Sequence, residues 1–322
     1  MYMGMSGEWE ALPGAFLERL EQVIPDDKLQ LVLQSFCQKK PTTLRANTLK
    51  ISPQKLIEEL SGMGFIFEKI SWMDNCFVLK NRTQRELTDT DFYKNGFFYL
   101  QNLSSQLPPI ILDPQVNEKI LDIAAAPGSK TTQIAALMEN TGEILANDKS
   151  RIRGYKLEAN LKIQGVTNVK VSYLPGQAIW KRYPEYFDKS LVDVPCSLEG
   201  TFRCDNSKSY ENWSVQKVKA LIQTQRYLLR SAVSATKAGG IIVYSTCTLA
   251  PEENEGIIDW ILKIEKDRLK VEEIKDIPDE LTIPAVREWK NKMYDSQIKN
   301  TLRILPNEIM EGFFVARLRK IY

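Results

Sequence analysis

The pattern of apolar and polar residues divides the chain into two stretches. Across residues 8–38 apolar positions recur at helical spacing, and the break at residues 24–27 predicts two amphipathic helices. The following segments alternate like strands around one capped helical segment. The strands are expected at TTLRANTL, FIFEKISWM and CFVLK, and the helix at SPQKLIEELSGMG. This first stretch therefore predicts a small α/β module.

After residue 114 the pattern becomes a repeated alternation of apolar strands and helical segments. Strands are expected at KILDIAAA, GEILANDKS, NVKVSYL, KSLVDVPCS, GGIIVYSTC and GFFVARL, and helices at SKTTQIAALMEN, IRGYKLEANLKIQG and near residues 214–237 and 252–266. This order is typical of an α/β fold with an open, mostly parallel sheet and helices on both faces. We place the N-terminal helices and the small module in residues 1–105, and the sheet domain in residues 106–322.

The composition narrows the classes of protein that fit. No apolar stretch in the 322 residues approaches the roughly 20 that cross a membrane. The first residues lack the basic and then apolar pattern of a secretory signal, so we expect a cytoplasmic protein. The five cysteines form no paired framework, so reduced thiols are expected. Histidine is absent, which excludes hydrolases that rely on a Ser-His or Cys-His pair.

Basic residues gather in one segment although the net charge is only +2. Residues 28–55 contain no acidic side chain, and their basic residues are Lys28, Lys39, Lys40, Arg45, Lys50 and Lys55. Two interpretations stay open for this basic run. It forms either a surface that contacts phosphates or a solvated basic face.

Four short segments follow predicted strands and are candidates for ligand binding. They are AAAPGSK (124–130), NDKS (147–150), DVPCS (193–197) and YSTCT (244–248). In parallel sheets, ligands bind beyond the carboxyl ends of the strands. The dinucleotide pattern GxGxxG is absent, and the glycine and lysine spacing of a P-loop is not met. Asp148 suits a ribose diol, because a carboxylate accepts two hydroxyl hydrogen bonds, but a helix-capping or surface aspartate is the alternative.

These segments together resemble the cytosine-5 RNA methyltransferases of the NOL1/NOP2/Sun family. The resemblance rests on PTTLRANTLK, GFFYLQNLSSQLP, LDIAAAPGSKT, the acidic residue Asp148 with Arg153 five positions on, DVPCS, YSTCTLAPEENE and RILPNEIMEGFFVARLRK, in this order along the chain. It implies a Rossmann-like class I methyltransferase sheet preceded by a small N-terminal α/β RNA-binding module. The sequences AAAPGSKTTQIAA and ANDKS are most similar to those of bacterial small-subunit rRNA members, whereas the length of the chain resembles that of archaeal tRNA-modifying members. The resemblance therefore favours rRNA as the substrate, with tRNA next.

The family's chemistry gives the cysteines roles. A thiolate adds to carbon 6 of cytosine, which makes carbon 5 nucleophilic enough to take a methyl group, and no metal is required. By resemblance Cys247, in the TCT motif, is the nucleophile, and Cys196, in the PCS motif, assists product release. Asp193 corresponds to the acid that contacts the base, and Lys130 to a lysine of the same site.

The resemblance also implies the cofactor, S-adenosyl-L-methionine, and its contacts. The residues carried over are Ala124, Ala125, Ala126, Pro127, Gly128, Ser129, Lys130, Asp148, Arg153 and Asp193. The chain departs from the family at Pro175 and Gly176, at Leu198, which is expected to narrow the cytosine pocket, and at Asn102. Three cysteines match no motif and are expected to be structural: Cys37, Cys76 and Cys204. The acids of the EENE segment are expected to cap the helix that follows: Glu252, Glu253 and Glu255.

Two other classes of function remain as alternatives. A DNA cytosine-5 methyltransferase also uses a Pro-Cys nucleophile, but it lacks the second cysteine of the TCT motif. A catalytically silent RNA-binding protein is disfavoured by the presence of Asp193, Cys196 and Cys247 together. We expect RNA as the partner, no membrane, and a monomer.

Overall fold

The structure is a computed structural model that describes residues 7–322. Residues 1–6, which belong to the start that was examined for a secretory pattern, lie outside the described residues. Within the described part, no helix combines the length and the apolar composition needed to cross a membrane.

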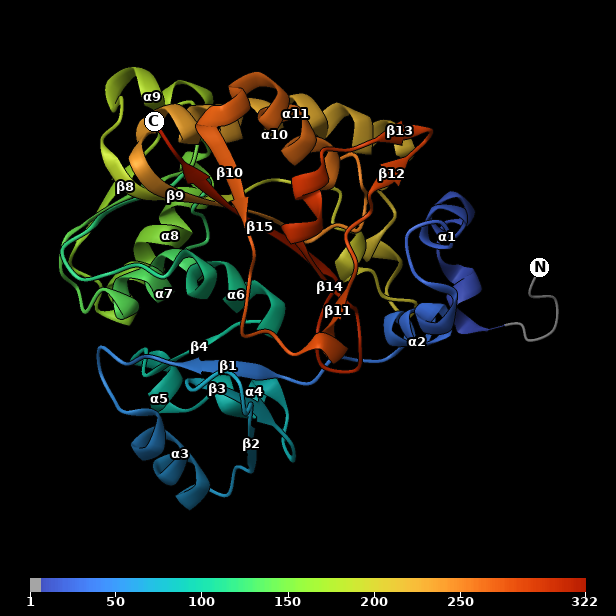
Figure 1. The fold of residues 1–322 in the computed structure, drawn as a ribbon. Helices are drawn as coiled ribbons and strands as arrows, with labels where there is room; N and C mark the ends of the chain where they lie inside the picture. Colours follow the sequence, from blue (N-terminus) through green and yellow to red (C-terminus); the bar gives the residue numbers. More distant parts are fainter. Residues whose placement is uncertain (1–6) are drawn as a thin grey trace.

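A nine-stranded sheet forms the centre of the molecule, in the order β11-β14-β15-β9-β8-β5-β6-β7, with β10 also paired to β15 (Figure 1). Its parallel strands are β5 (Lys119–Asp122), β6 (Glu143–Asn147), β7 (Val169–Ser172), β8 (Phe187–Asp193) and β9 (Thr236–Thr246). Its antiparallel strands are β10 (Leu269–Glu272), β11 (Thr282–Ile283), β14 (Leu302–Ile304) and β15 (Phe313–Lys320). The expected open, mostly parallel sheet is confirmed.

Helices cover both faces of this sheet. One face carries α6 (Leu103–Leu112), α7 (Ser129–Leu137) and α8 (Arg151–Gln164), and the other carries α9 (Ile179–Arg182), α10 (Val215–Ala235) and α11 (Glu255–Glu265). Successive residues of a strand point to opposite faces, so residues 241–244 of β9, which are covered on both faces, are Ile, Ile, Val and Tyr. Ile241 and Val243 join the core under α6 and α7, while Ile242 and Tyr244 join the core under α10 and α11.

A separate four-stranded antiparallel sheet forms the small module, in the order β2-β3-β1-β4. Its strands are β1 (Thr43–Ala46), β2 (Phe67–Lys69), β3 (Cys76–Leu79) and β4 (Phe98–Leu100), and its helices are α3 (Pro53–Gly62), α4 (Gln84–Thr88) and α5 (Asp91–Lys94). Ser52 caps α3 by accepting a hydrogen bond from the backbone N–H of Lys55, as the sequence predicts. The module has a core of its own, in which Leu44, Leu56 and Phe98 are buried.

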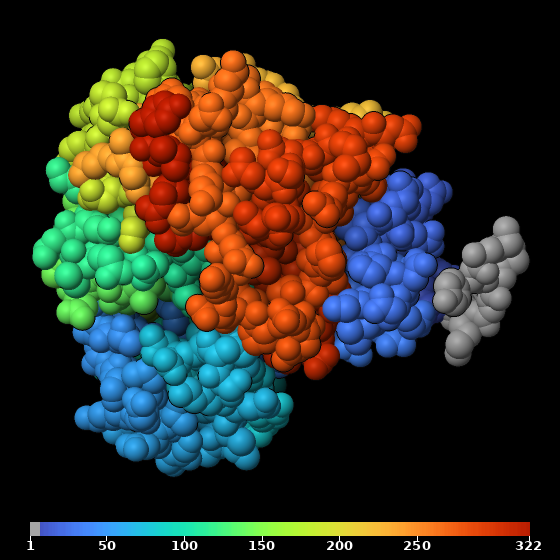
Figure 2. All heavy atoms as spheres, in the orientation of Figure 1, coloured from blue at the N-terminus to red at the C-terminus, as the bar shows by residue number. Residues whose placement is uncertain are grey.

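The N-terminal helices pack against the sheet domain and not against the small module. They are α1 (Gly14–Leu20) and α2 (Asp26–Cys37), preceded by a turn of 3-10 helix, η1 (Glu8–Ala11). Phe16 and Leu20 share a core with Phe202, Leu249 and residues of the C-terminal part. Figure 2 shows these blue helices against the orange C-terminal segment, which includes the hairpin of β12 (Glu288–Trp289) and β13 (Lys292–Met293). The boundary expected at residue 105 falls inside α6, so the domain division stays a prediction.

The basic run is only partly exposed: Lys39, Lys50 and Lys55 are exposed, whereas Arg45 is buried. Arg45 is only 4% exposed. Its guanidinium donates to Gln101 Oε1 at 2.6 Å, to Thr132 Oγ1 at 2.9 Å and to the carbonyl of Ser129 at 2.9 Å. Lys40 donates to the carbonyls of Ser35 and Asn307. A phosphate-contacting role for Arg45 is therefore wrong, because its guanidinium is buried and hydrogen-bonds β1 to the start of α7.

Cys37 and Cys204 form a disulfide, which corrects the expectation of reduced thiols. The backbone N–H of Cys204 donates to the carbonyl of Phe36 at 3.0 Å, and the two cysteine Cα atoms lie 4.8 Å apart, within the range that a disulfide bridges. The pairing joins positions 167 residues apart in sequence, so spacing alone could not reveal it. Cys76, Cys196 and Cys247 are free thiols.

Candidate active site

The carboxyl ends of the parallel strands open into one cavity of about 420 Å³. Both motif cysteines line it, together with Lys130, Asp193 and Arg153 and with Ala124, Ala126 and Pro127 of the turn after β5. Asp193 ends β8 and Cys196 follows it, while Cys247 follows β9, the next strand of the sheet. The parallel register places these segments side by side, because Asp193 pairs with Ser245.

The two thiols lie within contact of each other. Cys196 Sγ and Cys247 Sγ are 3.3 Å apart, and Cys196 is 7% exposed while Cys247 is more open to the cavity. The hydrogen bond to Cys247 and burial raise the pKa of Cys196 well above its ordinary value. The backbone N–H of Gly200 donates to the carbonyl of Cys247 at 3.0 Å, which ties the two cysteine loops together.

An ion pair stands beside the thiols. Lys130, in the first turn of α7, places its Nζ 2.8 Å from Asp193 Oδ2 and 2.9 Å from Ser105 Oγ. Ser245 donates its hydroxyl to the other oxygen of Asp193 at 2.8 Å. Although burial opposes the charge of Lys130, Asp193 beside it raises its pKa. Asp193 is thus oriented by fixed donors and still reaches the cavity.

The turn after β5 forms part of the cavity wall. Ala124, Ala126, Pro127 and Lys130 line the cavity, whereas Ala125, Gly128 and Ser129 lie behind it. Gly128 has φ +104°, and a Cβ there would lie 2.8 Å from Leu157 Cδ1 of α8. Only glycine fits this close approach of the turn to α8.

Asp148 has an unused acceptor. The residue is buried, at 3% exposure, and its Oδ1 accepts from the backbone N–H of Ser150 at 2.9 Å. Its Oδ2 lies 3.4 Å from Arg153 Nη1, at ion-pair distance, but makes no hydrogen bond. Arg153 also donates to the carbonyl of Ala126, so it links Asp148 to the turn after β5.

Four residues of the cavity were not expected: Ser105, Thr201, Glu311 and Phe313. Glu311 and Phe313 belong to the EGFF segment, which the sequence pattern marks only as the start of a strand. The Nζ of Lys130 lies 5.7 Å from the centre of the Phe313 ring, a cation–π distance. Leu198, which the sequence places at this pocket, does line it, at 45% exposure and with φ +66°.

The EENE acids do not cap α11, which corrects that expectation. Asn254 is the N-cap residue and makes no capping bond with its side chain. The three carboxylates hold other parts of the chain instead. Glu252 binds Arg19, Glu253 binds the backbone of Ser197, and Glu255 binds Arg303. Capping was a reasonable expectation from position alone, but these long-range partners cannot be read from local sequence.

Within residues 7–322 no group of three or more histidine, cysteine or acidic side chains is placed to hold a metal ion. The groups that the cavity offers are thiols, an ammonium, carboxylates and backbone N–H groups. Such groups suit addition to an electron-poor ring and proton transfer.

A parallel sheet with this order and a cofactor-sized cavity at its strand ends places the chain among Rossmann-like, class I methyltransferases. A crystal structure of a methyltransferase homolog protein from Pyrococcus horikoshii matches it with a TM-score of 0.80 and 32% identity, over 96% of this chain and 100% of that one. The family model for 16S rRNA methyltransferase RsmB/F matches residues 109–319, and that for the N-terminal domain of 16S rRNA methyltransferase RsmF matches residues 12–103. The chain belongs to this family, and the resemblance to the NOL1/NOP2/Sun family is confirmed.

Two curated relatives differ in their named substrates. Ribosomal RNA small subunit methyltransferase F of Vibrio campbellii is 36% identical over 318 residues, which cover 96% of this chain and 63% of the relative. The tRNA (cytosine(49)-C(5))-methyltransferase of Pyrococcus abyssi is 40% identical over 282 residues, covering 86% of this chain and 88% of the relative. The chain thus spans less than two thirds of the length of the ribosomal RNA relative.

Proposed function

We propose that this protein transfers a methyl group from S-adenosyl-L-methionine to carbon 5 of a cytosine in RNA, through a covalent cysteine–cytosine intermediate. The observation that carries the proposal is the pair of thiols 3.3 Å apart, in one cavity with the Lys130–Asp193 ion pair. A single nucleophile would need one thiol. Two at adjacent strand ends suit a reaction in which a carbon–sulfur bond first forms and then breaks.

The residues on the other side of the cavity fit the cofactor. The buried Oδ2 of Asp148 lacks a hydrogen-bond donor, and a ribose diol would supply one. When bound, S-adenosyl-L-methionine supplies a methyl group on a sulfonium sulfur and leaves as a neutral thioether. The turn Ala124–Lys130 would hold its methionine part, and Arg153 and Asp193 line the same cavity.

The remaining residues would act on the base. The Cys247 thiolate adds to carbon 6, and the electron density that moves to the ring N3 edge is stabilised by a proton shared between N3 and the Asp193 carboxyl group, which keeps it when the thiolate is expelled. Lys130 holds this carboxyl group in place. Once carbon 5 carries the methyl group, its proton leaves to a base, the carbon 5–carbon 6 double bond re-forms and the Cys247 thiolate is expelled. Cys196, beside Cys247, assists this release.

The substrate we favour is rRNA, with tRNA next, because the two curated relatives carry these names. The cytosine must leave its stack to reach the cavity. We further propose that the protein works in the cytoplasm as a monomer.

A methyl-transfer assay tests this function and its substrate class. Transcripts of small-subunit rRNA and of tRNAs, and a duplex DNA, are incubated with the protein and a methyl-labelled donor. We expect label in RNA, located at single cytosines by bisulfite sequencing, and none in DNA. Label in DNA, or no label in any RNA while the protein binds the donor, contradicts the proposal.

The roles of the two cysteines can be distinguished by the RNA product or protein–RNA adduct that each alanine variant forms. Cys247→Ala should form no adduct and transfer no methyl group. Cys196→Ala should still attack and methylate, but it should accumulate an adduct that carries the labelled methyl group and survives denaturing electrophoresis. The reverse outcome, in which Cys247→Ala accumulates the adduct and Cys196→Ala makes none, would exchange the two roles.

A further inference from the structure

One pair of buried side chains holds both neighbours of Cys196. Gln225 of α10 donates its amide N–H to the carbonyl of Pro195 at 3.0 Å, and the backbone N–H of Ser197 donates to Glu253 Oε2 at 3.0 Å. Gln225 Nε2 also donates to Glu253 Oε2 at 2.6 Å, and both side chains are fully buried. The turn that carries Cys196 is therefore fastened immediately before and immediately after the thiol.

A different side chain holds the neighbours of Cys247. Thr246, before the cysteine, donates its hydroxyl to Asn254 Oδ1 at 2.6 Å. The amide of Asn254 donates to the carbonyl of Thr248, after the cysteine, at 2.9 Å. Asn254 is fully buried. Adjacent residues of the EENE segment thus contact the neighbours of different thiols. Glu253 acts on the Cys196 turn through Gln225 and Ser197, and Asn254 acts on the Cys247 turn through Thr246 and Thr248.

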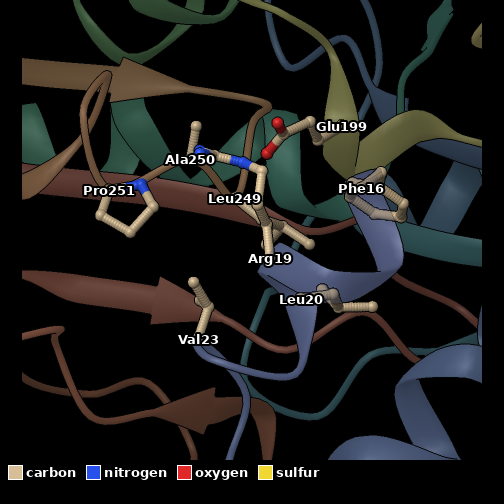
Figure 3. Close-up of a pocket in the computed structure, with 8 residues that line it drawn as sticks. All are labelled: Phe16, Arg19, Leu20, Val23, Glu199, Leu249, Ala250 and Pro251. Carbon is tan, nitrogen blue, oxygen red and sulfur yellow. The ribbon is translucent and has the colours of Figure 1, made fainter. Parts of the chain in front are cut away.

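The residues behind these hydrogen bonds leave little room for solvent. Glu199 accepts from the Thr248 hydroxyl at 3.0 Å and from the indole N–H of Trp213 at 3.0 Å. Figure 3 shows Arg19 of α1 reaching toward Glu199 across a hollow that Leu249 and Pro251 also line. The hollow measures about 10 Å³, about the space of a single water. A side chain lost from the layer above it has little solvent to replace its hydrogen bonds.

The surroundings of the Gln225–Glu253 pair are acidic. Burial raises the pKa of Glu253 to about 7, and Glu199 adds to the rise. Glu253 Oε1 and Gln225 Oε1 are buried without a donor. The charged or titratable groups near the Gln225–Glu253 pair and Cys196 are Glu199, Arg19, Tyr244 and the two thiols. The hydrogen bond to Cys247 and burial raise the pKa of Cys196, and the Glu253 charge adds to the rise, whereas Asn254 carries no charge.

We propose that Gln225 and Glu253 are positioning residues for Cys196, and that Asn254 is the positioning residue for Cys247. The proposal rests on the proposed function, because it assigns the first pair to product release and Asn254 to attack on the base. It predicts that substitution of Glu253 slows product release, whereas substitution of its neighbour Asn254 slows attack on the base.

The test compares three alanine variants, Gln225→Ala, Glu253→Ala and Asn254→Ala, with the conservative variant Glu253→Gln. Each receives the RNA that accepts methyl in the assay above. Gln225→Ala and Glu253→Ala should accumulate methylated adduct and lose roughly 10- to 100-fold in kcat with little change in KM. Asn254→Ala should form adduct more slowly and accumulate none. Glu253→Gln keeps an acceptor oxygen for Ser197 and Gln225 and should release product close to the wild-type rate at pH 6.

Thiol alkylation gives a second readout that needs no RNA and no activity. In a Cys247→Ser background, iodoacetamide labelling of Cys196 is followed against pH. Gln225→Ala should change the rate of Cys196 labelling, Glu253→Gln should move its midpoint to lower pH, and Asn254→Ala should do neither. If wild-type protein methylates no RNA, the proposed function fails while this readout still tests the positioning.

Two results would overturn the proposal. One is an equal loss of adduct in all three alanine variants, since it would show that the segment supports the whole site without distinguishing the thiols. The other is release at the wild-type rate by folded Gln225→Ala. Alanine is a strong helix former, so this variant should fold even if Glu253→Ala does not.

Discussion

Cys196 and Cys247 are identical side chains that their surroundings make different. Cys247 faces the cavity on the side of Lys130, whose charge interacts with it. The hydrogen bond to Cys247 and burial raise the pKa of Cys196, and the nearby charge of Glu253 adds to the rise. A negative sulfur is therefore opposed at Cys196, whereas Cys247 is more open to the cavity. This asymmetry supports Cys247 as the nucleophile on physical grounds, independently of the motif that contains it.

Asp148 is the residue whose role is most directly measurable. Asp148→Asn keeps Oδ1 for the backbone N–H of Ser150 but replaces the unpartnered Oδ2 with an amide. Binding of S-adenosyl-L-methionine, measured by calorimetry, should weaken by about 1–3 kcal/mol because a charged acceptor for the ribose is lost. The melting temperature serves as the control and should stay close to wild type. Unchanged affinity would remove Asp148 from the cofactor site.

At the scale of elements, predictions succeeded where periodicity was strong and failed where contacts were distant. The parallel strands and the helices α7, α8, α10 and α11 follow from apolar runs and caps in the sequence. The strands β10, β11 and β14 are short and carry no clear alternation, so they were not predicted. The cavity residues named from motifs lie together or just behind the cavity wall. The roles proposed for Glu253 and Gln225 could not be predicted, because they rest on hydrogen bonds between residues distant in sequence.

Arg45 joins two elements, and its loss should be costly. Arg45→Met leaves Gln101, Thr132 and the carbonyl of Ser129 without their buried donor. Urea unfolding should show a loss of about 2–4 kcal/mol, and Arg45→Lys should not restore it, because an ammonium cannot reproduce the guanidinium fork.

Lys39 is the matched control, since it belongs to the same basic run and is exposed. Lys39→Ala should leave stability within about 0.5 kcal/mol of wild type. If Lys39 contacts a phosphate, the slope of RNA affinity against salt falls by about one. Similar stability losses in both variants would contradict the structural difference between them.

The Cys37–Cys204 disulfide joins α2 to the segment after the Cys196 turn. It closes a loop of 167 residues and should stabilise the oxidised protein by roughly 2–5 kcal/mol. Addition of a reducing agent should lower the melting temperature of the wild type but not that of Cys37→Ser. Equal responses to the reducing agent, or labelling of all five cysteines in the unfolded protein without that agent, would show that the bond does not form.

For the whole molecule, buried carboxyl groups set the direction of the pH dependence. Burial raises the pKa of Asp122 and of Glu253 to about 7 each. A carboxyl group whose pKa is higher in the folded state favours folding below its unfolded pKa, and this contribution is lost as pH rises through the folded pKa. These two groups should therefore lower stability progressively between about pH 5 and pH 8.

Glu253→Gln isolates one of the two groups. Because glutamine does not ionise, the variant should gain about 1–3 kcal/mol relative to wild type between pH 5 and pH 8. Urea unfolding at both pH values measures the change, and Asp122 keeps its own contribution in both proteins. A constant difference between the two proteins across this range would mean that Glu253 does not titrate there.

The packing of α1 has a consequence for the protein while it is being made. The apolar face with Phe16 and Leu20 is covered by residues as distant as Ile283, Trp289 and Leu305. A ribosome adds about 5–20 residues per second, so roughly 15–60 s separate the synthesis of α1 from that of its last partners. During that interval the native contacts of the helix are limited to residues made earlier, such as Phe36, Phe202 and Leu249. A nascent chain that pauses before residue 283 is thus the form most exposed to aggregation and most in need of a chaperone.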